Sequence, residues 1–549
     1  MNKLILVNCP PWGVVMPPLG IACLSAYLRA KGLAADIFDL NLDLYEQADS
    51  QQQLFWHLAE INRIKPVKIA ENIFQAFENH IERFVDSLEQ YKIIGFSANN
   101  LISAVFAGFA ADKIKLKYPD KVIILGGPGI YHSWDRKAIA TKNIDFFIIG
   151  EGELALEKFI REFSNNPSAD YLCSKIPGLL YAQDSADIAY LPWQPIKDLN
   201  SLPYPDFQEF DLNRYNKNSE YHPLPMLLSR GCINQCGYCI DWYICGSFRM
   251  KSPELIIQEL KYLKQKYNIT HIEFNDLLCN GNPHALDKLC KQIREEKLNL
   301  TWISYAAIRK NMTQELLDDL KQAGCNSLCY GLESGSDRIL KQMNKHYTAA
   351  DAQAVLEKSF KAGIQGSLNI IVGFPGETEE DFQQTIDFIK RNCKYISQVT
   401  NVSSFVLMPG SDVGIYPRRF GIKFLDPLDP GKWTDENNLS QAERNQRVKR
   451  ICDLLKELKI KNLIVNYQDE NFNPKAKDSL IIEETEILNQ KKNKDKDKDL
   501  TVLNPGQFKR EHKIFKFILL LALFGASIII EFYLLILKKI RKSIVFPGN

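Results

Sequence analysis

The sequence predicts an α/β protein made of a doubly wound, Rossmann-like domain, a partial (β/α)6 barrel and a C-terminal hydrophobic helix. Three observations lead to this prediction. Short apolar stretches alternate with longer amphipathic stretches up to about residue 425, a pattern typical of parallel sheets covered by helices. A connector that contains Pro and Asn divides this pattern near residue 200. After about residue 475 the pattern gives way to charged sequence and then to one long apolar stretch.

The first domain is predicted to span residues 1–195, with a helical insertion at residues 51–90. Ligands of parallel sheets bind beyond the carboxyl ends of the strands, where this sequence has glycine-containing loops. Glycine allows the backbone to approach a cofactor closely, although plain turns would explain the same residues. We expect strands at residues 4–7, 35–40, 93–98, 122–125 and 146–149, and candidate cofactor-binding residues Gly126, Gly127, Pro128, Gly150, Glu151 and Gly152.

The second domain is predicted to span residues 223–425, after a connector at residues 196–222. Its helix starts are well marked, because Ser252 precedes a proline and Thr378 precedes acidic residues. Six strand–helix units would make an open, partial barrel instead of the full eight, with the chemistry on the loops that follow the strands. The predicted strands are residues 226–228, 271–275, 302–306, 327–330, 368–372 and 403–407.

The end of the chain is predicted to hold a helical extension at residues 426–475, a charged linker at 476–508 and a membrane-associated helix at 513–540. The apolar stretch of this helix, residues 517–537, is interrupted only by Glu531 and has the roughly 20 residues that span a bilayer. Basic residues flank it on both sides, so the sequence gives no orientation. A helix lying in the membrane interface and a helix docked on the catalytic body are the alternatives.

The amino-acid composition and net charge make some classes of protein less plausible than others. With 549 residues the chain is too long for one hydrophobic core, and 45% apolar and 24% charged residues are ordinary for a globular protein. The net charge of +2 gives no argument for binding nucleic acid. Thirteen cysteines without an N-terminal signal peptide argue against a disulfide framework and for a reducing cytoplasm.

The most informative motif is formed by Cys232, Cys236 and Cys239, with the spacing Cys-x3-Cys-x2-Cys. A closed structural zinc site needs four ligands. Three thiolates on one short loop can instead hold three irons of a cubane cluster and leave the fourth iron open to a ligand. A loop of buried thiols or a partial zinc site is the simpler alternative. The other cysteines near predicted strand ends are expected to be small buried residues. Among them, Cys245 is the nearest in sequence to the motif.

This loop resembles the cluster loop of the radical S-adenosylmethionine (radical SAM) enzymes, in which an aromatic residue, here Tyr238, precedes the third cysteine. Further motifs of that family follow in its order at predicted strand ends, over residues 271–276, 331–335, 371–377 and 405–410. The resemblance implies a 4Fe–4S cluster on the three cysteines and SAM bound to its open iron. The residues that it implies near SAM are Tyr238, Glu333, Ser334, Gly373, Pro375, Gly376 and Glu377.

The N-terminal domain resembles the cobalamin-binding domain that is fused to a large branch of this family. Residues 17–20, 125–128 and 149–153 carry this resemblance, together with the connector sequence at 202–206. The Asp-x-His-x-x-Gly motif, whose histidine ligates cobalt in other cobalamin proteins, is absent from the sequence. Cobalamin is therefore expected without a protein ligand to its metal, and His132 is expected to be a polar loop residue.

The resemblance implies an enzyme that cleaves SAM reductively to a 5′-deoxyadenosyl radical. Cobalamin-dependent methylation of an unactivated carbon is the expected outcome. A radical cyclase, rearrangement or carbon–carbon coupling enzyme acting on a lipid or isoprenoid is one alternative, and a membrane-tethered cobalamin- or redox-sensing module is another. The expected partners are an electron donor such as flavodoxin or ferredoxin, a small-molecule or lipid substrate and the membrane, but no nucleic acid. The catalytic domains are expected in the cytoplasm, anchored by the C-terminal helix.

Overall fold

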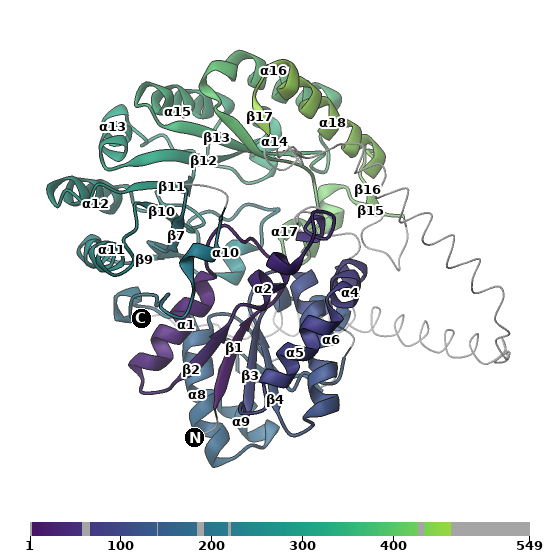
Figure 1. Cartoon of the computed structure of the whole chain (residues 1–549). Coiled ribbons are helices and arrows are strands. Elements are labelled where there is room, and N and C mark those ends of the chain that lie inside the picture. Colours follow the sequence, from purple (N-terminus) through teal and green to yellow (C-terminus); the bar gives the residue numbers. More distant parts are fainter. Residues whose placement is uncertain are drawn as a thin grey trace, which may run out of the picture. The chain divides into compact units, whose positions relative to one another are not determined.

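The computed structural model describes residues 3–56, 66–139, 141–183, 191–217, 221–425 and 433–462 (Figure 1). The predicted charged linker and the predicted membrane-associated helix lie outside these residues, as does the last part of the predicted helical extension. Within the described ranges, no helix is both long enough and apolar enough to cross a membrane.

The N-terminal domain is built on a sheet with the strand order β2-β1-β3-β4-β5-β6. The first five strands lie at the predicted places and are parallel to one another. The sixth strand is antiparallel to β5, and the sequence pattern does not reveal it because it is only three residues long. The strands are β1 (Leu4–Asn8), β2 (Ala35–Phe38), β3 (Ile93–Ser97), β4 (Val122–Gly126), β5 (Phe146–Ile148) and β6 (Leu179–Tyr181).

Both faces of this sheet are buried, which explains why its strands are almost wholly apolar. In β1, Leu4 and Leu6 belong to one buried cluster, while Ile5 and Val7 belong to another, because successive side chains of a strand point to opposite faces. The surrounding helices are α1 (Leu19–Ala30), α2 (Leu40–Gln47), α4 (Pro66–Ala76), α5 (Glu78–Ser87), α6 (Leu101–Lys117), α7 (Ser133–Ala138), α8 (Gly152–Asn165) and α9 (Ala169–Lys175).

The second sheet has seven parallel strands in the order β17-β14-β13-β12-β11-β10-β7. Two predicted strands are misplaced: the first ends at Met226, where it was expected to begin, and β14 ends at Ser404 because Phe405 turns into a separate buried cluster. The short β17 adds an edge strand that was not expected. The strands are β7 (Pro223–Met226), β10 (His271–Phe274), β11 (Thr301–Ala306), β12 (Cys325–Glu333), β13 (Gln365–Val372), β14 (Gln398–Ser404) and β17 (Lys461–Asn462).

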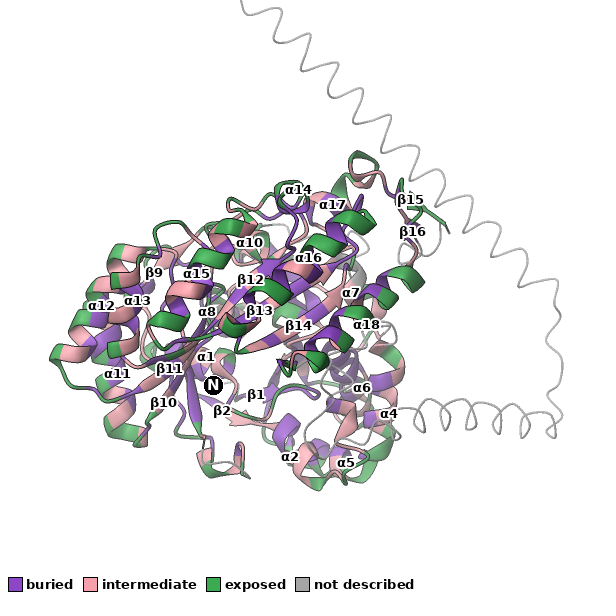
Figure 2. Cartoon of the chain, turned by 90° about the horizontal axis from the view of Figure 1, so that it is seen from above, coloured by how far each residue is buried: buried purple, intermediate pink, exposed green. Residues whose placement is uncertain are grey.

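The helices of this domain turn buried residues inward and exposed residues outward (Figure 2). The predicted caps are present: the Ser252 side chain accepts a hydrogen bond from the Leu255 amide, and Thr378 forms a capping box with Asp381. The helices are α10 (Asp241–Ile244), α11 (Pro253–Tyr267), α12 (Pro283–Glu295), α13 (Gln314–Gln322), α14 (Asp337–Gln342), α15 (Ala349–Lys361), α16 (Glu379–Asn392), α17 (Asp412–Ile415) and α18 (Gln441–Glu457).

One buried hydrophobic cluster is shared by the two sheet domains. It contains Ile21 of α1 and Phe159 of α8, and it continues through Phe207 of the connector into Leu224 of β7 and Leu260 of α11. The connector is therefore packed into the core instead of forming a free linker. As a result, the carboxyl-end loops of the N-terminal sheet can take part in fixing the loops of the barrel.

Candidate active site

A cavity at the carboxyl ends of the barrel strands has a volume of about 950 Å³. Its lining brings together residues from two segments that lie about 100 positions apart in the sequence. These are the three motif cysteines together with Tyr238, Glu333 and Lys345. The cavity is large enough for a nucleoside-sized ligand and a further molecule beside it.

The cysteine loop lies between two short antiparallel strands, β8 (Ser229–Arg230) and β9 (Arg249–Met250). Backbone amides of Asn234 and Asp241 lie 3.4 Å from the sulfurs of Cys232 and Cys239, so they can donate hydrogen bonds to thiolates. In the described ranges, no three Cys, His, Asp or Glu side chains converge on one point as they would around a single metal ion. A cubane cluster does not require such convergence, because each thiolate binds a different iron.

The middle of the cysteine loop is fixed by backbone contacts with two later segments. The Gly237 amide donates to the Met343 carbonyl over 3.0 Å, and the Gly237 carbonyl accepts from the Val413 amide over 3.1 Å. The side chain of Asn344 also donates to the Gln235 carbonyl over 2.6 Å. The loop is therefore held in place by the chain that follows α14 and by the start of α17.

Glu333 ends β12 and forms the polar edge of the cavity. Its Oε1 atom accepts hydrogen bonds from the Tyr238 hydroxyl at 2.8 Å and from Lys345 Nζ at 3.0 Å. Burial alone would lower the pKa of Lys345, but Glu333 and Tyr238 raise it well above its usual value, so Lys345 is a cation. Both contacts use Oε1, which leaves Oε2 of Glu333 available to a ligand hydroxyl or ammonium group. Sequence reasoning missed Lys345, which sits in an irregular loop without any periodic signal.

Two polar residues of the barrel that the sequence singles out, Asp276 and Ser334, are buried and bonded to other parts of the protein. Asp276 is buried and accepts hydrogen bonds from the backbone amides of Leu228 and Ser229, at 3.0 and 2.5 Å. Burial raises the pKa of Asp276 to about 6. Ser334, predicted near SAM, is fully buried with its hydroxyl 3.3 Å from that of Thr385. These residues hold the ends of β7 and β12 in position.

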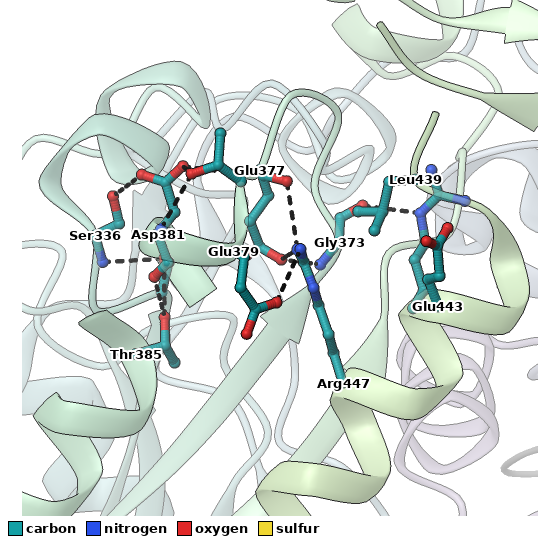
Figure 3. A network of polar contacts seen from close by, with 12 residues as sticks. Ser336, Gly373, Glu377, Glu379, Asp381, Thr385, Leu439, Glu443 and Arg447 are labelled. Atoms are coloured by element: carbon teal, nitrogen blue, oxygen red, sulfur yellow. Dashed lines mark hydrogen bonds and ion pairs between the residues drawn. The ribbon is translucent and has the colours of Figure 1, made fainter. Parts of the chain in front are cut away.

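The predicted SAM-binding loop at residues 373–377 is tied to α18 (Figure 3). Glu377 Oε2 accepts hydrogen bonds from the Gly373 amide at 2.7 Å and from Arg447 at 2.6 Å. Burial raises the pKa of Glu377 to about 7, although the Gly373 amide and Arg447 oppose this shift. Since this carboxylate is only 1% exposed, it supports the loop from within.

Two further contacts fix the other side of this loop. Arg444 Nε donates to the Gly373 carbonyl at 3.0 Å, and its guanidinium lies 3.5 Å from the centre of the Trp433 ring. The Gly376 amide donates to Asp435 at 2.9 Å. Gly373 has a φ of +75°, and a Cβ atom there would lie 2.4 Å from Arg444 Cγ, so the position requires glycine. Gly373, Pro375, Gly376 and Glu377 are not among the described residues that line the cavity.

The glycines predicted to approach a corrin are accounted for by packing within the protein. A Cβ atom on Gly127, where φ is +100°, would lie 2.4 Å from the Ala98 carbonyl oxygen. A Cβ atom on Gly150, where φ is +87°, would lie 2.4 Å from the Trp193 ring. The turn explanation is sufficient for these two loops, and their contact with a cofactor stays a prediction. Gly126 is the last residue of β4, Pro128 follows Gly127, and Gly152 is the first residue of α8.

Glu151, also predicted to contact a cofactor, is part of a bridge to the cysteine loop. It pairs with Arg249 at 2.9 Å and with Arg230 at 3.5 Å, and it accepts from the Ile196 amide at 2.6 Å. Arg230 also pairs with Glu153 at 2.5 Å. The loop after β5 therefore contacts the hairpin that carries the cysteines.

The loop after β1 presents apolar side chains at the carboxyl edge of the N-terminal sheet. Trp12 is 44% exposed and Val15 is 41% exposed. Met16 Sδ lies 3.9 Å from Asn275 Nδ2, and Asn275 lines the 950 Å³ cavity. This edge is therefore continuous with the rim of the cavity and offers the kind of apolar surface on which a flat macrocycle can lie.

Comparison with known proteins agrees with these features. Residues 226–389 match the family described as the radical SAM superfamily. An uncharacterized methyltransferase of Pyrococcus horikoshii is 26% identical over 301 residues, which cover 54% of this chain and 64% of that protein. The tRNA-2-methylthio-N(6)-dimethylallyladenosine synthase of Lachnoclostridium phytofermentans is 30% identical over 237 residues, which cover 41% of this chain and 47% of that protein. The matched part thus spans about half to two thirds of these relatives.

Two solved structures share the fold over most of both domains. TsrM from Kitasatospora setae, a radical SAM methyltransferase solved with cobalamin and a [4Fe-4S] cluster, superposes with a TM-score of 0.60 at 16% identity, covering 81% of this chain and 85% of that one. OxsB, a cobalamin-dependent radical SAM enzyme, gives 0.62 at 17% identity, covering 82% and 66%. Residues 226–389 therefore form a radical SAM domain, which implies a 4Fe–4S cluster and SAM as cofactors.

Proposed function

We propose that this protein cleaves SAM reductively in the barrel cavity. The observation that carries the proposal is that Cys232, Cys236 and Cys239 line the same cavity as the Glu333–Lys345 pair. A reduced 4Fe–4S cluster supplies one electron for cleavage of SAM into methionine and a 5′-deoxyadenosyl radical, which abstracts hydrogen from a substrate. The three cysteines, which line one cavity, would hold the cluster.

The residues around the cysteines have separate tasks in this proposal. Glu333 would accept a hydrogen bond from SAM through Oε2, while Lys345 balances its charge in the partly closed cavity. Tyr238 would hold Glu333 in place and present its ring to the ligand. The loop at residues 373–377 would act through its shape, since its side-chain contacts point toward α18.

The proposal is tested by anaerobic reconstitution of the full chain with iron and sulfide, followed by incubation with SAM and dithionite. We expect 5′-deoxyadenosine as a product. If a methyl group is also transferred, we expect S-adenosylhomocysteine in addition. A protein that assembles its cluster and binds SAM but forms neither product would instead be the sensing module that the sequence leaves open.

We further propose that the reaction is methylation with cobalamin as the methyl carrier. Support comes from the methyltransferase name of one relative and from the fold shared with two cobalamin-containing enzymes. In this chain the apolar rim made by Trp12 and Val15 lies beside the cavity. Cobalamin bound at this rim would supply a methyl group to a substrate in the cavity. We expect the protein to bind about one equivalent of hydroxocobalamin. Trp12→Ala should reduce the cobalamin absorbance that stays with the protein after unbound cobalamin is removed. Retention of the same absorbance by this variant would place the macrocycle elsewhere.

The apolar stretch near the C-terminus supports a proposal about location. An apolar surface of this size needs a bilayer or a partner surface to cover it. We propose that the full chain sediments with membranes and resists extraction with high salt, which releases only electrostatic attachment. Recovery of the chain in the supernatant after the salt wash would contradict this proposal. A substrate that resides in the bilayer would agree with such an anchor.

A further inference from the structure

Reductive cleavage of SAM needs an electron from outside the protein, so a surface near the cysteine loop must admit a carrier. We propose that the surface formed by α17, the following turn at Pro417–Phe420 and β15 (Lys423–Phe424) is the docking site of an acidic one-electron carrier of the flavodoxin or ferredoxin kind. This inference rests on the proposed function. It is argued from the contacts, the apolar exposure and the charge of this surface, which we call the α17–β15 surface.

The α17–β15 surface lies directly behind the cysteine loop. The Val413 amide of α17 donates to the Gly237 carbonyl, and Gly237 stands between Cys236 and Tyr238 in the sequence. A Cβ atom on Gly237 would lie 4.0 Å from Phe420 Cζ, so one layer of side chains separates this turn from the loop. A carrier bound here would face the cluster loop from outside the cavity, and SAM and substrate could remain in place during electron transfer.

The surface combines exposed apolar residues with basic ones, as protein interfaces commonly do. Ile415 and Tyr416 are each 55% exposed, and Leu425 is 66% exposed. Figure 2 shows that β15 is exposed along its length. Exposed apolar side chains on such short segments are a common sign of a binding surface.

Charge selects the kind of partner. Arg418, Arg419 and Lys423 are exposed, and among the described residues none of them forms an ion pair. Among the described residues near this surface, the acids are the half-buried Asp412 and the exposed Glu436, whose Cδ would lie 3.3 Å from a Cβ atom on Gly421. The three exposed bases therefore outnumber the exposed acid in the described part of this surface. A surface with exposed basic residues beside apolar ones attracts an acidic partner and raises its association rate.

The electron transfer changes only the oxidation states of the carrier and the cluster. The carrier is oxidised by one electron and the cluster is reduced by one electron, and no bond in the protein forms or breaks. The carrier must therefore approach and leave in each cycle, which suits a small surface held by charge and a few apolar contacts better than a large permanent interface.

The test compares two reductants on the same preparation. We expect R418E/R419E to lower the initial rate of SAM cleavage driven by reduced flavodoxin about tenfold or more at low ionic strength. With dithionite, which needs no docking site, the rate should stay equal to that of the unchanged protein. The matched control is K390E/R391E, which reverses two exposed charges at the end of α16 and should leave both rates unchanged.

Each outcome has a defined meaning. Loss of the flavodoxin-driven rate alone, with a weaker dependence on salt, supports the docking site. Equal flavodoxin-driven rates in the unchanged protein and in R418E/R419E overturn it, whereas absence of cleavage with either reductant in the unchanged protein contradicts the proposed function instead. If R418E/R419E abolishes binding to vesicles that contain anionic lipid but keeps the flavodoxin-driven rate, the surface contacts the membrane and the carrier proposal is wrong. Tyr416→Ser should raise the flavodoxin concentration needed for half-maximal rate even at high salt.

Discussion

Arg230, two residues before the first motif cysteine, forms an ion pair at 2.5 Å with Glu153 at the start of α8. The two side chains are only 15% and 5% exposed, and they connect the N-terminal domain with the hairpin that carries the cysteine loop. Removing one partner of a buried ion pair leaves a charge without compensation, which costs about 3–5 kcal/mol. The cysteine loop therefore depends on a residue of the other domain for its position.

We expect Glu153→Gln to lower the iron content of the reconstituted protein and its melting temperature. Arg230→Met combined with Glu153→Leu should recover part of the stability, because an apolar pair removes the uncompensated charge. Iron content and thermal unfolding measure both effects. The comparison variant is Glu157→Gln, which changes a partly exposed acid one turn further along α8. An equal loss of iron in this variant would mean that the effect is not specific to the bridge.

Each of Cys232→Ala, Cys236→Ala and Cys239→Ala should abolish the absorbance of the 4Fe–4S cluster and the formation of 5′-deoxyadenosine. A site with three ligands has no thiolate to spare. Cys245→Ala is the control, because this residue follows α10 outside the motif. If Cys245→Ala removes the cluster as completely as the other three changes, the loop holds four thiolates and lacks an open iron.

Glu333→Gln should raise the KM for SAM about tenfold or more while the cluster is retained, because it removes a charged acceptor at the edge of the cavity. The change also leaves Lys345, whose side chain is only 11% exposed, without its carboxylate, and so it should lower the melting temperature. Glu333→Gln combined with Lys345→Met should restore stability but not the KM. A double variant that recovers both would show that Glu333 acts only as a partner of Lys345.

Arg447→Ala should raise the KM for SAM more than it changes kcat, because it releases Glu377 and with it the loop at residues 373–377. Arg447→Lys should restore part of the effect, since lysine keeps the charge without the planar fork. Arg450→Ala is the control, because Arg450 is 47% exposed and pairs with Glu379 on the surface. A kcat loss without any change of KM would mean that the loop does not bind SAM.

Asp381 should make folding sensitive to acid. Burial alone would raise the pKa of Asp381, but Arg338, Thr378 and Ser336 together hold it well below the usual value. These contacts stabilise the folded state above about pH 4. This stabilisation is lost as the pH falls further, because the Asp381 carboxylate becomes protonated. Asp381→Asn should lower the melting temperature at pH 7 and reduce its decline between pH 5 and 3. An unchanged decline would place the acid sensitivity in other carboxylates.

Local sequence was sufficient for much of the fold and for the centre of the candidate site. The apolar stretches gave the five parallel strands of the first sheet, and caps such as Ser252 and Thr378 gave helix starts, because these signals involve neighbouring residues. The spacing of Cys232, Cys236 and Cys239 likewise lies within one loop. Two strands, β7 and β14, were misplaced because the apolar stretches continue beyond the residues that pair.

Tertiary structure alone decided how the remaining residues are used. It brought Lys345 to Glu333, and it placed Arg444 and Arg447 of α18 behind Gly373 and Glu377, some 70 positions earlier in the chain. It also paired Glu151 and Glu153 with Arg230 of the hairpin that carries the cysteines. Such charges find their partners only when distant segments pack together and exclude water, and no pattern within a short stretch of sequence carries that information.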